Sequence, residues 1–193
     1  VSHSFVLSFL GDCAESMLHF ARLIPPETKR IALVDTTNDC IGTSLQTALA
    51  MFERYRELKQ QGEPGEAEKY RLFGVRCDTA GEISDRSIEP LGDPRLDCGV
   101  VPRLLTRLRH ALDDLHNKSA VPEDWREEAR RYFQQIKIVA SGGFDVERIA
   151  LFERIGAPVD IYGVGSAFFT GGSNDVTADV VRVQIKAEWI HMP

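Results

Sequence analysis

Four short apolar runs recur along the chain, and each ends in polar residues or glycine. They lie at residues 31–34, 72–75, 135–140 and 161–162. An apolar run of this length, bounded by turn residues, is typical of a strand buried on both faces, as in a parallel sheet. We therefore expect parallel strands whose C-terminal ends carry the polar and glycine residues.

Helical periodicity fills the segments between these runs. Apolar residues recur at the spacing of one helix face, and Pro122 with the acidic residues after it suits a helix start. The predicted helices run from residue 43 to 61, from 101 to 115, from 122 toward the third strand, and from 145 to 156. This alternation of strands and helices is the pattern of an α/β fold.

The chain opens with one further helical pattern. Ser2 precedes apolar residues at Phe5, Phe9, Cys13 and Met17, which predicts a single serine-capped helix that extends to about residue 21. His3 would then lie at the helix N-terminus, where the macrodipole disfavours imidazolium, and a neutral, nucleophilic ring is expected. The alternative is a terminal histidine in a frayed segment.

Two segments depart from the alternation. Residues 80–99 carry glycine, proline and charges without a period, and we expect a loop over the strand ends. Residues 178–185 alternate in hydrophobicity, which predicts an edge or antiparallel strand with Trp189 packing nearby.

Composition limits the classes of function. The chain has 193 residues, 43% of them hydrophobic, and a formal charge of −6, which argues against a nucleic-acid-binding surface. Its four cysteines show no CxxC spacing, so reduced thiols in a cytoplasmic protein are expected. We find no membrane-spanning run and no signal peptide. Because the chain begins with Val1 and ends at Pro193, we expect a portion of a longer protein.

The glycines at two strand ends are the first candidates for chemistry. Ser141, Gly142 and Gly143 follow the third apolar run, and Gly165 and Ser166 follow the fourth. Glycine lets backbone N–H groups face a ligand without an intervening Cβ, so the pair predicts a cradle for a phosphate or phosphosugar. A tight turn is the alternative at each site taken singly.

Charged and polar residues at the other two strand ends extend this candidate site. Arg76 and Asp78 point to one side of an extended segment, and an arginine held by a carboxylate suits phosphate; a structural ion pair is the alternative. Asp35 and Thr36 end the first run. For Asp145, a helix cap and a ribose contact both remain open.

Six ordered motifs together resemble the nicotinate phosphoribosyltransferase family. They are Ser-His-Ser-Phe at 2–5, Leu-Val-Asp-Thr at 33–36, Gly-Val-Arg-Cys-Asp-Thr at 74–79, Val-Ala-Ser-Gly-Gly-Phe-Asp at 139–145, Gly-Ala-Pro-Val-Asp at 156–160 and Tyr-Gly-Val-Gly-Ser at 162–166. The resemblance implies an incomplete TIM-like α/β barrel with helices outside, a separate N-terminal domain that this chain lacks, and a homodimer. It implies a cytoplasmic enzyme of NAD biosynthesis that joins nicotinate to phosphoribosyl pyrophosphate, coupled to ATP hydrolysis.

The resemblance also implies roles for the candidate residues. His3 matches the histidine that ATP phosphorylates, Arg76 would hold the phosphoribosyl and base end of the substrate, and Asp78 would orient Arg76 or meet ribose hydroxyls. Mg²⁺ on the pyrophosphate is implied, because a departing pyrophosphate needs its charge neutralised. The remaining substrate-binding positions are Asp35, Thr36, Thr79, Ser141, Gly142, Gly143, Gly165 and Ser166.

The sequence departs from the family at several of these motifs. Asp78-Thr79-Ala80-Gly81-Glu82 stands where many members have Asp-Ser-Gly-Asp, and Thr37 and Asn38 stand where many have tyrosine and aspartate. One alternative is a quinolinate-type phosphoribosyltransferase, which shares the barrel but uses no phosphohistidine. Another is a catalytically silent phosphate-binding module, which would bind ligand without turnover.

Overall fold

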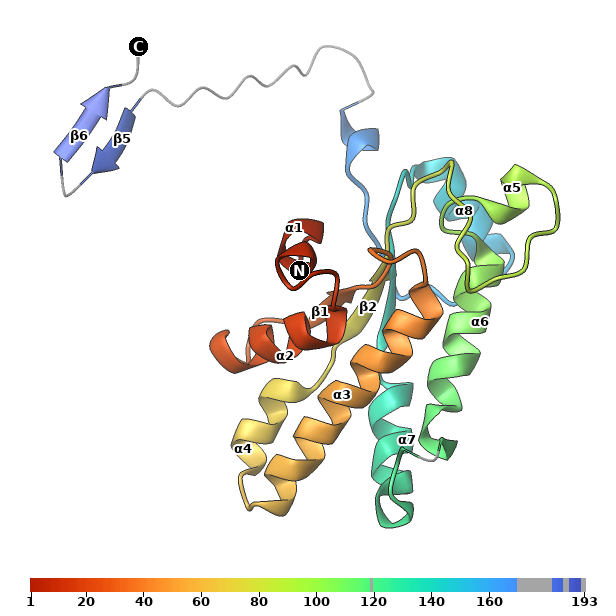
Figure 1. The fold of residues 1–193 in the computed structure, drawn as a ribbon. Coiled ribbons are helices and arrows are strands. Elements are labelled where there is room, and N and C mark those ends of the chain that lie inside the picture. Colours follow the sequence, from red (N-terminus) through yellow and green to blue (C-terminus); the bar gives the residue numbers. More distant parts are fainter. Residues whose placement is uncertain (119, 170–181, 186–187, 192–193) are drawn as a thin grey trace.

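The protein is described here by a computed structural model that covers residues 1–118, 120–169, 182–185 and 188–191 (Figure 1). Parallel strands alternate with helices, as the sequence predicts. The strands of the main sheet are β1 (Ile31–Leu33), β2 (Gly74–Cys77), β3 (Lys137–Ala140) and β4 (Ile161–Tyr162). The longer helices are α2 (Cys13–Leu23), α3 (Cys40–Gln60), α6 (Pro102–Asp113), α7 (Arg126–Gln134) and α8 (Val146–Arg154).

Short helices complete the described part of the chain. They are α1 (His3–Ser8), α4 (Pro64–Ala67), η1 (Glu68–Tyr70), α5 (Pro94–Asp97), η2 (Leu115–Asn117), η3 (Glu123–Trp125) and η4 (Ser166–Phe168).

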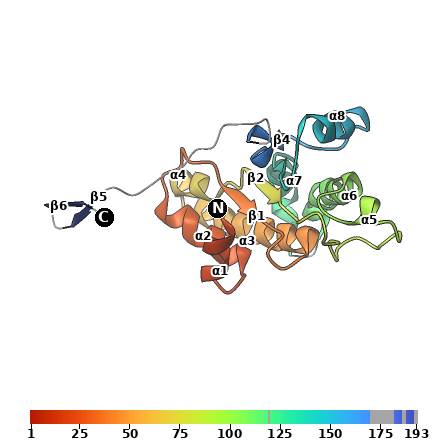
Figure 2. The same ribbon diagram turned by 90° about the horizontal axis from the view of Figure 1, so that it is seen from above.

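The four strands of the sheet are all parallel and follow chain order, β1-β2-β3-β4. One face of the sheet is fully buried along β1, β2 and β3, where it is formed by Ala32, Val34, Val75, Cys77, Ile138 and Ala140. Tyr162 of β4, on the same face, is partly buried. In the view along the sheet, the helices follow one another around one side of it (Figure 2). A doubly wound sheet reverses its strand order and carries helices on both faces, so sequential order with one-sided helices is the arrangement of a section of an α/β barrel.

The helix predicted at the N-terminus is divided in two, which corrects the expectation of one continuous helix. Leu10 and Gly11 have φ angles of 56° and 88°, and the Leu10 side chain is 99% exposed. Asp12 then caps α2 by accepting a hydrogen bond from the Glu15 N–H at 2.9 Å. A left-handed residue pair followed by an N-cap ends one helix and starts another, and this signal overrides the continuous apolar spacing.

The other predicted helices are confirmed. Leu104, Leu105, Leu108 and Leu112 of α6 are fully buried, as their spacing predicts. In α3, Leu45 and Leu49 are only partly buried, whereas Thr47, Met51 and Tyr55 are fully buried. Asp145 caps α8 by accepting from the Arg148 N–H at 2.8 Å, which favours the helix-cap interpretation of that residue.

The loop over the strand ends is held by two buried carboxylates. Asp85 accepts hydrogen bonds from the Cys40 N–H at 3.0 Å and the Ser87 N–H at 2.9 Å, which ties residues 80–99 to the start of α3. Asp97 accepts from the Gly92 N–H at 2.8 Å and from Arg103 at 2.7 Å. This loop therefore has a fixed conformation next to the strand ends.

The predicted closing strand lies partly outside the described residues, which begin again at residue 182. Residues 182–185 form β5 (Arg182–Ile185), which pairs with β6 (Glu188–His191) in an antiparallel ladder that places Trp189 opposite Gln184.

The four cysteines, Cys13, Cys40, Cys77 and Cys98, are free thiols. Among the described helices, none has the length and apolar character needed to cross a bilayer.

Candidate active site

The predicted polar residues meet in one row across the C-terminal edge of the sheet. Leu33, Arg76, Val139 and Ile161 are register partners on successive strands. Side chains alternate between the faces of a strand, so the residues two positions further share a face and form the next row. That row is Asp35, Asp78, Ser141 and Gly163, on the face opposite the fully buried one.

His3 joins this row through Asp35. The His3 Nε2 atom lies 3.0 Å from Asp35 Oδ2, and the side chains are 46% and 9% exposed. His3 is the first residue of α1, whose N-cap is the predicted Ser2. Because a carboxylate can only accept, Asp35 selects the tautomer that carries the proton on Nε2, which leaves the lone pair on Nδ1. His3 and Asp35 are 32 positions apart, so the sequence does not show that they pair, although both were predicted candidates.

Arg76 and Asp78 lie on the same side of β2, as strand alternation predicts. Their closest charged atoms, Arg76 Nη2 and Asp78 Oδ2, are 4.0 Å apart, which is an ion pair but longer than a hydrogen bond. Both side chains are about one third exposed or less, at 32% and 26%. The carboxylate is therefore near the guanidinium without occupying its N–H donors.

Three buried polar atoms without a partner lie at this edge of the sheet, and three more lie in α3 and α6, on Ser44, Thr47 and Arg103. Within the described residues, Asp35 Oδ1, Thr36 Oγ1 and Arg76 Nε are buried and have no hydrogen-bond partner. Such atoms are rare in folded proteins, because each lost partner costs about 1–3 kcal/mol. Acceptors and a donor left open together are what a polar ligand satisfies.

The glycines after β3 form a tight turn, which was the alternative to the predicted phosphate cradle at this strand end. Gly142 and Gly143 have φ angles of 92° and 73°, which favour glycine. A Cβ on Gly142 would lie 3.1 Å from the Thr79 carbonyl oxygen, so the turn also packs against the end of β2. Ser141 is 8% exposed and donates its hydroxyl to the Cys77 carbonyl at 3.3 Å, which fixes the strand end beneath the turn.

Arg148 holds this turn from behind, and the sequence analysis missed it. Its Nη1 donates to the Gly142 carbonyl at 2.7 Å and its Nη2 donates to the Val100 carbonyl at 2.8 Å, while the guanidinium stacks 4.4 Å from the Phe144 ring centre. Burial lowers the pKa of Arg148, and Asp145 opposes the shift. The one available signal was an arginine three residues after a helix cap, which is common on helix surfaces.

The contact with Arg148 fixes the direction of the neighbouring N–H groups. In a trans peptide the C=O of one residue points opposite to the N–H of the next. With the Gly142 carbonyl turned to Arg148, the Gly143 N–H points away from it. Arg148 therefore fixes the direction in which the Gly143 N–H points.

The other predicted positions, Thr79, Gly165 and Ser166, lie outside the row of Asp35, Asp78 and Ser141. Thr79 is 3% exposed and its hydroxyl lies 3.6 Å from Cys40 Sγ, so this side chain faces α3 and not the row of Asp78. The hydrogen bond to Cys77 and burial raise the pKa of that Cys40 thiol. Gly165 and Ser166 are exposed at the start of η4, beyond the end of β4.

Gly163, unlike the exposed Gly165 and Ser166, packs directly against the end of β3. A Cβ on Gly163 would lie 2.9 Å from the Ser141 Cβ, so only glycine lets the ends of β3 and β4 approach this closely. The Gly163 N–H donates to the Ala140 carbonyl at 2.8 Å. Its motif was recognised in the sequence, but the close approach needed the structure.

The site can accept an anion and can supply one nucleophile. Arg76 and the turn at residues 142–143 offer donors, and Asp35 and Asp78 offer carboxylates. No group of three or more His, Cys, Asp or Glu side chains suited to a metal occurs among the described residues. Mg²⁺ usually needs only one or two carboxylates when phosphates supply the rest, so Asp35 and Asp78 fit an ion that arrives with a pyrophosphate.

Comparison with known proteins adds one structural likeness. No protein-family model matches the chain, and no curated protein matches it in sequence. The chain is similar to a solved structure titled nicotinate-nucleotide pyrophosphorylase, from Pyrococcus furiosus, with 24% identity and a TM-score of 0.42. The match covers 86% of this chain and 30% of that one, so the chain spans under a third of its length.

Proposed function

We propose that the chain carries the phosphoribosyl-transfer site of a nicotinate phosphoribosyltransferase-like enzyme. In this reaction nicotinate displaces pyrophosphate from C1 of phosphoribosyl pyrophosphate and gives nicotinate mononucleotide, with ATP hydrolysis coupled to the transfer. The observation that carries the proposal is the His3–Asp35 pair, because it gives an oriented nucleophile at the same sheet edge as the unbonded Nε of Arg76. The motif resemblance of the sequence points the same way.

Histidine chemistry gives the ATP step. The lone pair on His3 Nδ1 attacks the γ-phosphorus of ATP, an N–P bond forms, and ADP leaves with the electrons of the broken P–O bond. Asp35 stabilises the positive charge that the ring acquires. Water later cleaves the N–P bond and releases phosphate.

The sheet edge supports the transfer step. Arg76 would bind a phosphate or the carboxylate of the base, and its unbonded Nε gives it capacity for a further contact. Asp78 would meet the ribose hydroxyls, and the turn at Gly142 and Gly143 would bind the 5′-phosphate through backbone N–H groups. Gly165 and Ser166 remain proposed phosphate contacts, and Asp35 with Thr36 lies beside the base.

The quinolinate-type reaction is the second candidate. Arg76, Thr36 and the glycine turn would serve a pyridine with two carboxylates equally well, because none of them depends on His3. That reaction releases CO₂ and needs no ATP. A homodimer and a cytoplasmic location also remain proposals.

One assay separates these functions. The chain is incubated with phosphoribosyl pyrophosphate and Mg²⁺, with nicotinate and ATP in one arm and quinolinate alone in the other, and mononucleotide, pyrophosphate and CO₂ are quantified. We expect product in the first arm, and a loss of ATP dependence in His3→Ala. Product with CO₂ in the second arm only would establish the quinolinate-type reaction. Phosphoribosyl pyrophosphate binding without product in either arm would indicate a silent binding module.

A further inference from the structure

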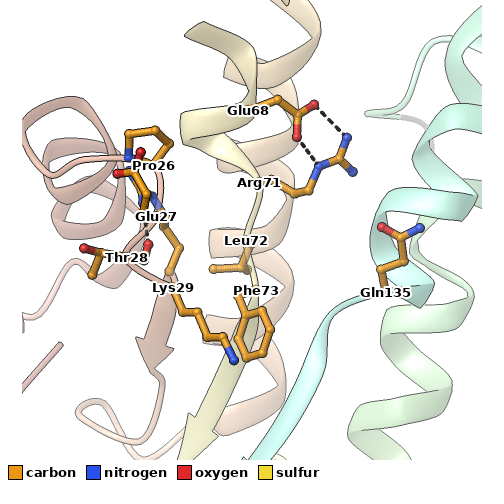
Figure 3. A pocket seen from close by; sticks show the side chains of 10 residues that line it. Pro26, Glu27, Thr28, Lys29, Glu68, Arg71, Leu72, Phe73 and Gln135 are labelled. Carbon is orange, nitrogen blue, oxygen red and sulfur yellow. Dashed lines mark hydrogen bonds and ion pairs between the residues drawn. The ribbon is translucent and has the colours of Figure 1, made fainter. Parts of the chain in front are cut away.

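Two cations at the N-terminal end of the strands are engaged within the protein. In a hollow of about 410 Å³ at that end, Arg71 donates to Glu68 at 2.7 Å, and the Lys29 ammonium lies 4.3 Å from the centre of the Phe73 ring (Figure 3). The candidate active site lies at the other end of the strands. There, the loop after β1 meets the loop after β2, and each loop carries one half of the site.

The two halves of the site depend on the spacing between these loops. The loop after β1 carries Asp35, which lies 3.0 Å from the His3 ring, and the loop after β2 begins with Asp78 and continues into residues 80–99. Both carboxylates lie beyond the strand residues that pair in the sheet. Contacts between the two loops therefore set the distance from the histidine to the proposed ribose contact.

Asn38 joins the two loops through its side chain and its backbone. Its Nδ2 donates to the Ser84 carbonyl at 2.9 Å, and its own carbonyl accepts from the Arg86 N–H at 3.1 Å. The Asn38 N–H donates to the Asp35 carbonyl at 2.8 Å, which closes a four-residue turn on the residue that holds His3. One residue thus contacts both Asp35 and the loop after β2.

The backbone of Asn38 explains why an asparagine suits this position. Its φ angle is 55°, in the left-handed region, which asparagine adopts more readily than most other residues with a side chain. Asparagine therefore supplies a tolerated left-handed backbone and a side-chain donor together. Aspartate would keep the shape without the donor, and glycine would keep the backbone without the side chain.

A separate contact attaches the start of α3 to the same loop. Asp85 accepts from the Cys40 N–H at 3.0 Å and is fully buried. This bond holds the helix, whereas the bonds of Asn38 hold the turn that carries Asp35. Loss of the Asn38 amide should therefore loosen that turn while α3 stays attached, so the chain should still fold.

We propose that Asn38 is a positioning residue, whose hydrogen bonds to the loop after β2 fix Asp35, and with it His3, relative to Asp78. This role rests on the proposed function, because it serves the joining of the histidine step to the transfer step. When the turn is loose, Asp35 no longer orients the His3 ring. Arg76 and the glycine turn lie on other segments and keep their binding role, so the rate should fall with little change in affinity.

The first test needs no turnover. The ¹⁵N shifts of the His3 ring are compared at about pH 8, where imidazole is neutral, in the native chain, Asn38→Asp and Asn38→Gly. The native ring should show the tautomer protonated on Nε2, and both variants should move the two ring nitrogens toward the average of the two tautomers. Ring shifts that are the same in the native chain and in both Asn38 variants would overturn the proposal.

Asn117→Asp is the matched control. The Asn117 Nδ2 donates to Asp114 Oδ1 at 2.7 Å, in an exposed contact after α6, so this variant also exchanges a side-chain donor for a carboxylate. It should leave the His3 ring shifts unchanged. Shifts of equal size in Asn117→Asp and Asn38→Asp would mean that added charge alone moves the ring, and would contradict the role of Asn38.

The second test measures turnover in the same variants, with urea unfolding to show that each is folded. Asn38→Asp and Asn38→Gly should lower kcat about tenfold, keep the KM for phosphoribosyl pyrophosphate within about twofold, and hydrolyse more ATP for each mononucleotide formed. An unchanged kcat with an unchanged ratio of ATP to mononucleotide would contradict the proposal. Absence of product in the native chain would contradict the proposed function, and the ring shifts would still decide whether Asn38 positions His3.

Discussion

Two arginines at opposite ends of the strands of one sheet differ in how far the fold uses their hydrogen-bond donors. Arg30, before β1, is 2% exposed and donates to carbonyls from five residues: Ala21, Ile24, Pro25, Thr28 and Lys69. Arg76, at the end of β2, has a buried Nε without a partner and a carboxylate no nearer than 4.0 Å. The fold uses the donors of the first guanidinium, whereas the second has a buried donor that no described residue uses.

The largest expected effect is on stability at Arg30. Arg30→Gln removes most of these hydrogen bonds and leaves buried carbonyls without partners, so the free energy of unfolding should fall by about 3 kcal/mol. Urea unfolding measures this change in the free energy of unfolding. Arg130→Gln is the control, because the Arg130 side chain is 42% exposed and its hydrogen bonds to described residues go to Glu127 and Gln134. It should change stability by under about 0.5 kcal/mol. Equal losses of unfolding free energy in Arg30→Gln and Arg130→Gln would contradict the structural role of Arg30.

Arg76 should show the reverse pattern. Arg76→Gln should leave the free energy of unfolding within about 0.5 kcal/mol, since few interactions are lost, and should weaken phosphoribosyl pyrophosphate by about 30-fold, or about 2 kcal/mol. Calorimetric titration and urea unfolding of the same sample give both values. A variant that unfolds easily and still binds would make Arg76 a structural residue like Arg30.

Arg148 lies between these two types, because it uses its donors on the turn that would bind the anion. Arg148→Met keeps the stacking on Phe144 and loses the contact with the Gly142 carbonyl. Affinity for phosphoribosyl pyrophosphate should fall about tenfold, equal to about 1.4 kcal/mol. Arg148→Lys should recover part of the loss, and the Gly143 amide should sense ligand in the native chain only. Loss of stability without loss of affinity would contradict the orienting role.

The smallest expected effect concerns pH. Burial raises the pKa of Asp85, but hydrogen bonds from Cys40 and Ser87 outweigh burial and lower it below the ordinary value of 3.8. A carboxyl whose folded-state pKa is lowered stabilises the fold above its unfolded pKa, and the contribution disappears as pH falls through the folded value. Stability should therefore decline below about pH 4, and Asp85→Asn should remove about 1 kcal/mol at pH 7 and flatten the acid limb. An unchanged acid limb in thermal melts would contradict this assignment.

Local patterns were sufficient to predict the parallel strands, because a buried strand and its terminal glycines are written in consecutive residues. The same holds for Arg76 and Asp78, which alternation alone places on one side. The break at Leu10 and Gly11 was missed because apolar spacing on both sides fits one helix. Thr79 was assigned to the site although its side chain alternates to the face of α3.

Contacts between distant segments could not be read from local patterns. The pairing of His3 with Asp35 spans 32 positions, and the contact of Arg148 with Val100 spans 48. Both depend on how strand ends and loops converge, which the register of the sheet decides. The same is true of Arg30, whose role is visible only once its carbonyl partners surround it.

The most direct test of the proposed function asks whether His3 accepts phosphate. The chain is incubated with γ-labelled ATP and Mg²⁺, and protein-bound label is tested for acid lability and base stability, with His3→Ala and Asp35→Asn as variants. We expect label on His3 Nδ1 in the native chain, much less label in Asp35→Asn, and none in His3→Ala. Absence of label in the native chain, or label that persists in His3→Ala, would contradict the ATP-coupled function.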